Sequence, residues 1–113
     1  MKQEWINALR SGKYKQGRRK LRDGDYFCCL GVLCDLVNKD NWIYSPEYGL
    51  PLSWIDETKT YESEELPIAL GERLFTAKRG SVNAVFFILA ERNDFGCSFE
   101  EIADLIEAKL EDK

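Results

Sequence analysis

Hydrophobic residues recur at helical spacing in the first third of the chain. Trp5, Ile6 and Leu9 share one side of a short helix over 4–11, and Gly12 is well suited to end it. A second helix is predicted over 29–37, since at 100° per residue its apolar side chains fall within one broad arc. These side chains are Cys29, Leu30, Leu33, Cys34, Leu36 and Val37. Gly31 and Asp35 are expected to face away from that arc.

The distal third of the chain predicts a pair of helices. Ser81 is placed to cap a helix through "VNAVFFILAER", which is apolar nearly all round and therefore central to the core. "NDFG" is expected to form the next turn. Ser98 and Glu101 then form a capping box before the last helix. The apolar residues of that helix are Phe99, Ile102, Ala103, Ile106 and Leu110.

Strand signals are weaker and lie between the helices. Asp23-Gly24 is a hairpin signal, so residues 16–22 and 25–28 are predicted to pair as antiparallel strands. A short strand is expected near Trp42–Tyr44, and Pro67 suits the first turn of a short helix towards Phe75. The rest of 38–66 is left unassigned. The prediction is therefore one α+β domain over 1–113, a small antiparallel β-hairpin packed with about four helices.

Charge is distributed unevenly along the chain. Residues 1–22 carry eight Lys or Arg and one Glu, a net +7, whereas residues 23–113 carry eight against nineteen, a net −11. The two sum to the chain's net charge of −4. This asymmetry favours a local anion site on an acidic body and disfavours specific DNA binding, which needs several cations along one face.

The candidate ligand site is the basic segment. Its proposed residues are Lys13, Tyr14, Lys15, Arg18, Arg19, Lys20, Arg22 and Tyr26. If 16–22 is a strand, alternation puts Arg18, Lys20 and Arg22 on one face and Arg19 on the other. Arginine forks match phosphates, and tyrosines can stack a base. Two alternatives stay open: an acidic protein partner, or pairing of these cations with the chain's own carboxylates.

The four cysteines do not have the spacing of a zinc site. Structural zinc takes paired ligands a few residues apart, whereas Cys29 and Cys34 diverge by about 140° on a helix. The chain has no histidine, the commonest metal ligand and a frequent proton-transfer group. Reduced cysteines that pack as small hydrophobes are therefore expected, with Cys28 the candidate reactive thiol because it lies off the apolar arc. No metal or cofactor is expected.

Two motifs resemble a known family. "ALRSGKYKQGRRKLRDGDYFCCLGVLCDL" and "LAERNDFGCSFEEIADLIE" resemble small proteins encoded by tailed phages and prophages, over residues 5–37 and 89–107. In that family Leu more often directly precedes Asn-Asp, whereas here Ala90-Glu91-Arg92 intervenes. The resemblance implies an accessory protein made during infection or carried on a prophage, and such proteins often antagonise host defence by binding.

The expected function combines this resemblance with the basic segment. We expect a non-enzymatic protein that sequesters a small anionic, nucleotide-like immune signal. The alternatives are a protein–protein inhibitor of a host defence or regulatory protein, and a small nucleotide hydrolase. The start of the chain lacks the apolar region of a signal peptide and no stretch is long enough to cross a bilayer. The cytoplasm of a bacterial host is therefore the expected location, and self-association is left open.

Overall fold

The computed structural model describes residues 1–57 and 59–113, which pack around one hydrophobic core. The helices are α1 (Lys2–Arg10), α2 (Cys29–Val37), α3 (Ile68–Leu74), α4 (Val82–Asp94) and α5 (Phe99–Lys109). The strands are β1 (Lys15–Gln16), β2 (Arg22–Asp23), β3 (Tyr26–Phe27), β4 (Trp42–Tyr44), β5 (Pro51–Asp56), β6 (Lys59–Glu62), β7 (Phe75–Ala77) and β8 (Leu110–Asp112). The predicted α+β class is confirmed, with five helices in the described residues where about four were expected.

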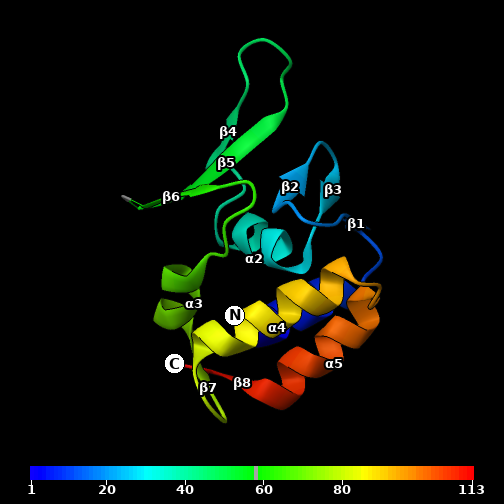
Figure 1. Ribbon diagram of the computed structural model, residues 1–113, viewed down its shortest axis with the longest axis vertical. Coiled ribbons are helices and arrows are strands. Elements are labelled where there is room, and N and C mark those ends of the chain that lie inside the picture. The colour runs from blue at the N-terminus through cyan, green and yellow to red at the C-terminus, as the bar shows by residue number, and fades with distance from the viewer. Residues whose placement is uncertain (58) are drawn as a thin grey trace.

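The helices form the lower body of the molecule in Figure 1, and α2 lies between them and the small sheets above. Helix α1 packs against α5 and α2, and α4 packs against α2, α3 and α5. Helices α1 and α5 bury the apolar sides predicted for them, and α2 buries most of its predicted arc. The expectation that α4 is central to the core all round was wrong, because only one side of α4 faces its neighbours and Phe87 on the other side is 61% exposed. Trp5 shows how tightly the helices meet, since its fully buried indole Nε1–H donates to the Cys29 carbonyl at 2.9 Å.

The helix ends follow local sequence signals. Gly12 has φ +76°, the left-handed conformation expected just after a helix. The Ser81 hydroxyl accepts from the Ala84 amide, and Ser98 and Glu101 form the predicted capping box. Two boundaries were predicted wrongly. Asn93 and Asp94 are the last residues of α4 and not part of a turn, and Leu110 leaves α5 to begin β8, which pairs with β7.

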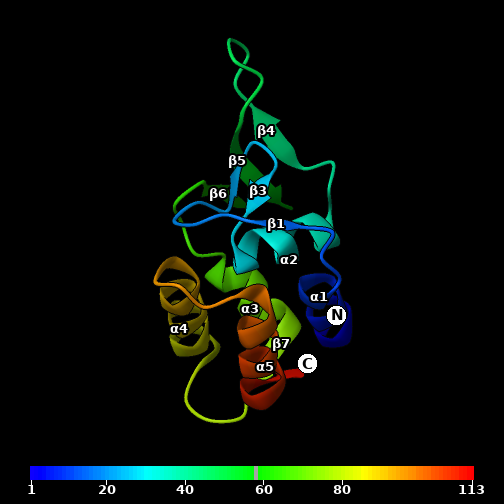
Figure 2. The same ribbon diagram turned by 90° about the vertical axis from the view of Figure 1, so that its right-hand side faces the viewer.

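The predicted hairpin exists, but its first strand is much shorter than expected. β2 pairs antiparallel with β3, so the predicted hairpin is confirmed, but its two-residue turn is Gly24-Asp25 and not Asp23-Gly24, because Asp23 belongs to β2. Residues 17–21 are not a strand; they form a loop in which Arg19 has φ +68°. β1 lies on the other side of β3 and runs parallel to it. This three-stranded sheet lies beside α2 (Figure 2).

Helix α2 is close to the loop at one residue that was predicted to face away. Gly31 is buried, and a Cβ atom at this position would lie 1.7 Å from the Leu21 carbonyl oxygen. The backbone of the loop therefore rests directly on the helix, which only glycine allows without movement. The expectation that Gly31 faces away was wrong because it considered the helix's own arc and not the chain that crosses it.

The region left unassigned contains the second sheet. β5 pairs antiparallel with both β4 and β6, and Trp42 lies opposite Trp54 where this sheet meets the body. The short strand at Trp42–Tyr44 is confirmed. The outer part of β4 and β5, with the turn between them, forms a protruding hairpin over residues 43–52, which we call the arm (Figure 1). The arm contributes to the 43 × 29 × 22 Å extents of the molecule.

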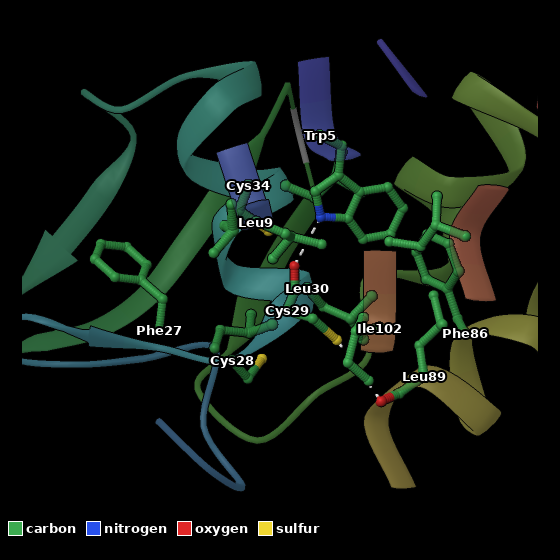
Figure 3. Close-up of a cluster of buried hydrophobic side chains, with 14 of the residues drawn as sticks. Trp5, Leu9, Phe27, Cys28, Cys29, Leu30, Cys34, Phe86, Leu89 and Ile102 are labelled. Carbon is green, nitrogen blue, oxygen red and sulfur yellow. Dashed lines mark hydrogen bonds between the residues drawn. The ribbon is translucent and has the colours of Figure 1, made fainter. Parts of the chain in front are cut away.

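The cysteines of α2 belong to the core. Cys29 and Cys34 are fully buried and Cys28 nearly so, among side chains from α1, α4 and α5 (Figure 3). The Cys29 thiol is 3.7 Å from the Leu89 carbonyl, and the Cys28 sulfur accepts from the Gly31 amide as the N-cap of α2. The prediction that these cysteines pack as small hydrophobes is confirmed.

Candidate functional site

Part of the basic segment borders an open depression of about 490 Å³. Its lining residues come from the stretch before β1, from β1 to β3 and from α2: Lys13, Tyr14, Lys15, Arg22, Asp25, Phe27 and Asp35. Three cations and two carboxylates thus line the depression, together with the aromatic residues Tyr14 and Phe27. This volume is in the range of small-molecule sites, although the depression is open where such sites are usually more enclosed.

Arg22 lies among aromatic rings and hydrogen-bond acceptors. Its guanidinium carbon lies 4.7 Å from the Phe27 ring centroid, 5.4 Å from that of Trp42 and 5.8 Å from that of Tyr44. Its Nε–H donates to the Gly24 carbonyl, and one terminal nitrogen donates to the Tyr44 hydroxyl at 3.0 Å. Within the described residues no carboxylate lies within 4 Å of it. The aromatic rings therefore hold a guanidinium whose charge is not paired within that part of the chain.

Asp35, which also lines the depression, is held by two hydrogen bonds. Asp35 accepts from the Tyr14 hydroxyl at 2.6 Å and from the Trp42 indole N–H at 3.0 Å, one bond to each oxygen. Burial, and then the bond to Asp35, raise the pKa of Tyr14 well above its ordinary value of 10.0. Tyr14 is thus a neutral donor at physiological pH, and its ring packs edge-on to Phe27 at 5.1 Å.

The two lysines of the depression are more exposed than Arg22. The Lys15 ammonium lies 5.8 Å from the ring centroid of Tyr26, which is half exposed on β3. Lys13 follows Gly12 at the end of α1, and its amide donates to the Ser11 hydroxyl. Both side chains remain free to reorient towards an anion that enters beside Arg22.

The other three predicted cations lie elsewhere. Arg18 donates to the Asn93 carbonyl at the end of α4, and the Arg19 amide donates to the Asp94 carboxylate. Arg19 and Lys20 line a second, small hollow together with Glu64 and Glu65. The predicted alternation of Arg18, Lys20 and Arg22 on one face was wrong because residues 17–21 are a loop. The structure therefore splits the predicted site into two groups.

Asn93 holds this loop in place. Its fully buried amide oxygen accepts from the Cys29 amide and from the Gln16 side chain, and its nitrogen donates to the Gly17 carbonyl. A buried amide that uses both its donor and its acceptor in this way fixes the backbone around it. Asn93 thus determines the path of residues 16–18 between the two groups of cations.

Sequence reasoning missed the role of Asp35 in the depression. It was assigned to the outer side of α2 and given no part in the site. A signal was present, since Asp35 is the only charged residue of α2, and it lies on the side where Trp42 and Tyr14 meet the helix. A lone carboxylate on an otherwise apolar helix indicates a polar partner nearby.

The thiols lie away from the depression. Burial raises the pKa of Cys28 to about 11, and burial likewise raises the pKa values of Cys29 and Cys34 well above the ordinary 9.0. Cys28 is therefore protonated and shielded, which does not favour the suggestion that it is reactive. Cys97 is partly exposed. Over residues 1–57 and 59–113 no three Cys, Asp or Glu side chains are grouped so that they could hold a metal ion.

Comparison with known proteins identifies a family. A family model described as "Domain of unknown function (DUF8296)" matches residues 1–110. The chain belongs to this family. No curated protein and no solved structure matches it. Within the part of the chain that the structure describes, no helix is both long enough and apolar enough to cross a membrane.

Proposed function

We propose that this protein is a non-enzymatic binding protein that captures a small anionic, nucleotide-like molecule in the depression beside Arg22. The observation that carries the proposal is the guanidinium of Arg22, which three aromatic rings hold in place without a carboxylate partner among the described residues. Lys13 and Lys15 supply further positive charge at the same opening. A phosphate can take both the fork of Arg22 and the lysine ammonium groups.

The aromatic side chains suit the rest of such a ligand. Tyr26 is half exposed beside Lys15, and Tyr44 is nearly half exposed beside Arg22, so either ring can stack on a base. Tyr14 and Asp35 are already bonded to each other, and this bond orients the wall. The proposed role of Arg18, Arg19 and Lys20 is reduced accordingly, because they point to the other side of the loop.

The resemblance to phage and prophage proteins supports the biological part of the proposal. In that setting the captured molecule is an immune signal of the bacterial host, and the protein acts as an antagonist of host defence. Sequestration needs only binding, so the ligand leaves the protein chemically unchanged.

Calorimetry of the purified protein with cyclic dinucleotides and ADP-ribose-type molecules tests the proposal. We expect one of them to bind and to raise the melting temperature, because a ligand that binds only the folded state stabilises it. Lys13→Ala/Lys15→Ala should weaken binding at least tenfold. The matched control is Lys78→Ala/Arg79→Ala, which removes two cations outside the depression and should leave binding unchanged.

Two outcomes would contradict the proposal. If no member of the panel binds, the protein–protein inhibitor becomes the leading interpretation. If the bound nucleotide is recovered by chromatography in a cleaved form, the protein is an enzyme.

A further inference from the structure

The arm exposes more large apolar side chains than any other segment of comparable length. Its exposed residues are Ile43, Tyr44, Tyr48, Leu50 and Leu52, of which Tyr48 is 77% exposed and both leucines are 48% exposed. Figures 1 and 2 show that the arm extends beyond the rest of the molecule. A two-stranded hairpin in water is marginally stable on its own, and contiguous apolar patches on protein surfaces commonly mark interaction sites.

At the base of the arm the large apolar side chains are buried. Trp54 is fully buried and packs on Trp42 and Tyr61. Leu52 lies two residues further out along β5, at an irregularity in the pairing of β4 with β5, and its side chain is 48% exposed. The apolar side chains that are buried at the base are thus followed by exposed ones further out along the arm.

The arm also ends the sheet with a free edge. In the order β4-β5-β6, β4 pairs with β5 and with no other strand among the described residues. The Asn41 carbonyl accepts from the Ile55 amide, so by antiparallel alternation Trp42 and Tyr44 turn their backbone groups away from β5. Such an edge can pair with another strand.

Charge indicates which strand fits. Between residues 41 and 55 the only charged residue is Glu47, near the tip, while Lys39 and Asp40 lie just before the base. If two β4 strands pair antiparallel about a twofold axis at Ile43, the tip of each arm lies alongside the base of the other. Glu47 of each copy then lies near Lys39 of the second copy. Two nearly uncharged arms can approach despite the net charge of −4.

We propose that the arm is a self-association surface, where β4 pairs with β4 of a second copy of this chain. The arm carries the free edge, the exposed apolar side chains and Glu47, and Lys39 lies just before its base. One copy thus supplies both halves of each contact, which is the self-complementarity that a twofold interface requires. The exposed side chains of the arm offer on the order of 500 Å² per copy, less than the roughly 800 Å² of a standard interface. The dimer is therefore weak and depends on concentration. This inference does not depend on the proposed ligand.

Analytical ultracentrifugation over a range of concentrations tests the proposal. The wild-type mass should rise from 13.1 kDa towards twice that value as concentration increases. Tyr48→Ser/Leu50→Ser should stay monomeric. The matched control Phe87→Ser/Phe95→Ser removes two exposed aromatic side chains from α4 and its C-terminal end and should dimerise like wild type. A wild type that remains monomeric to about 500 µM, or an arm variant that still dimerises, overturns the proposal.

A charge exchange tests the antiparallel arrangement without altering the apolar face. Glu47→Lys and Lys39→Glu should each weaken the dimer several-fold, because each places like charges together across the axis. The double variant Glu47→Lys/Lys39→Glu restores opposite charges and should regain wild-type affinity. If the double variant is as weak as the two single changes combined, the arms do not pair in this way.

Discussion

The basic segment contains two stretches that the sequence does not distinguish but the fold does. Residues 17–21 form the anchored stretch, which α2, α4 and the Ser63 carbonyl hold from three sides. Lys13, Lys15 and Arg22 flank it and border the depression. The Arg18 side chain and the Arg19 backbone donate to the end of α4, whereas the Arg22 side chain donates to the Gly24 carbonyl and the Tyr44 hydroxyl. In the described part of the chain, no cationic side chain of either stretch has a carboxylate within 4 Å.

Cations that are neighbours in the sequence of the basic segment are therefore not all neighbours in space. The backbone path decides which charges meet a ligand, and the anchored stretch sets that path. Changes to the anchor should therefore cost stability, while changes to the flanking residues should cost binding. Variants of the two stretches should therefore differ in which property they change, the stability of the fold or the binding of a ligand.

The largest effect is expected for Gly31→Ala. The new Cβ atom would lie 1.7 Å from the Leu21 carbonyl oxygen, so the backbone of the anchored stretch must move. We expect a loss of about 3 kcal/mol or more in the free energy of unfolding, as in severe overpacking. Denaturant titration measures it. Gly71→Ala is the comparison, since its Cβ atom would lie 2.6 Å from atoms of the Phe86 ring, a side chain and not backbone. Equal losses would show that the Leu21 contact is not special.

The next effect is expected for Asn93→Ala. This change leaves the Cys29 amide and the Gly17 carbonyl without their partner in a buried region. Each unsatisfied buried group costs about 1–3 kcal/mol, so we expect a loss of about 3 kcal/mol in all. Asn83→Ala, at an exposed position of the same helix, is the control and should change little. A small effect of Asn93→Ala would mean that the anchored stretch does not need this residue.

Much of the helical part of the fold could be predicted because its signals are local. Ser81, Ser98 with Glu101, and Gly12 mark helix ends within one turn of the chain. The apolar periodicity of α2 likewise gave its bounds, Cys29–Val37, correctly. These features depend on neighbours three or four residues away, which a single sequence displays.

The remaining features depend on residues far apart in the chain. The path of the anchored stretch depends on Asn93, more than seventy residues away, and the burial of Gly31 depends on Leu21 crossing the helix. The depression needs Asp35 and Trp42 beside Tyr14. No local pattern reports such contacts. The sequence therefore indicated which residues are cationic or aromatic, but not which of them share a surface.

A smaller effect is expected for Tyr14→Phe, which tests the wall of the depression. Loss of the hydrogen bond to Asp35 should lower stability by about 1 kcal/mol near neutral pH. The folded protein raises the pKa of Tyr14 above 10.0, so its stabilising contribution is complete below pH 10 and is lost as the pH rises further. The difference between wild type and variant should therefore shrink above pH 10. If wild type and variant are equally stable at every pH, the hydroxyl contributes nothing and Tyr14 acts only through the packing of its ring.

The smallest effect on stability is expected where the effect on binding is largest. Lys13→Ala/Lys15→Ala removes two exposed lysines, and such residues rarely contribute measurably to folding. Its denaturant midpoint should match that of wild type, although nucleotide binding is expected to fall. Arg18→Ala/Arg19→Ala should behave in the opposite way, with a lowered midpoint because the bond to the Asn93 carbonyl is lost, and with binding retained. Both variants carry the same change in charge, so a difference between them cannot arise from net charge alone. If Arg18→Ala/Arg19→Ala abolishes binding while Lys13→Ala/Lys15→Ala retains it, the ligand binds at the anchored stretch and not at the depression.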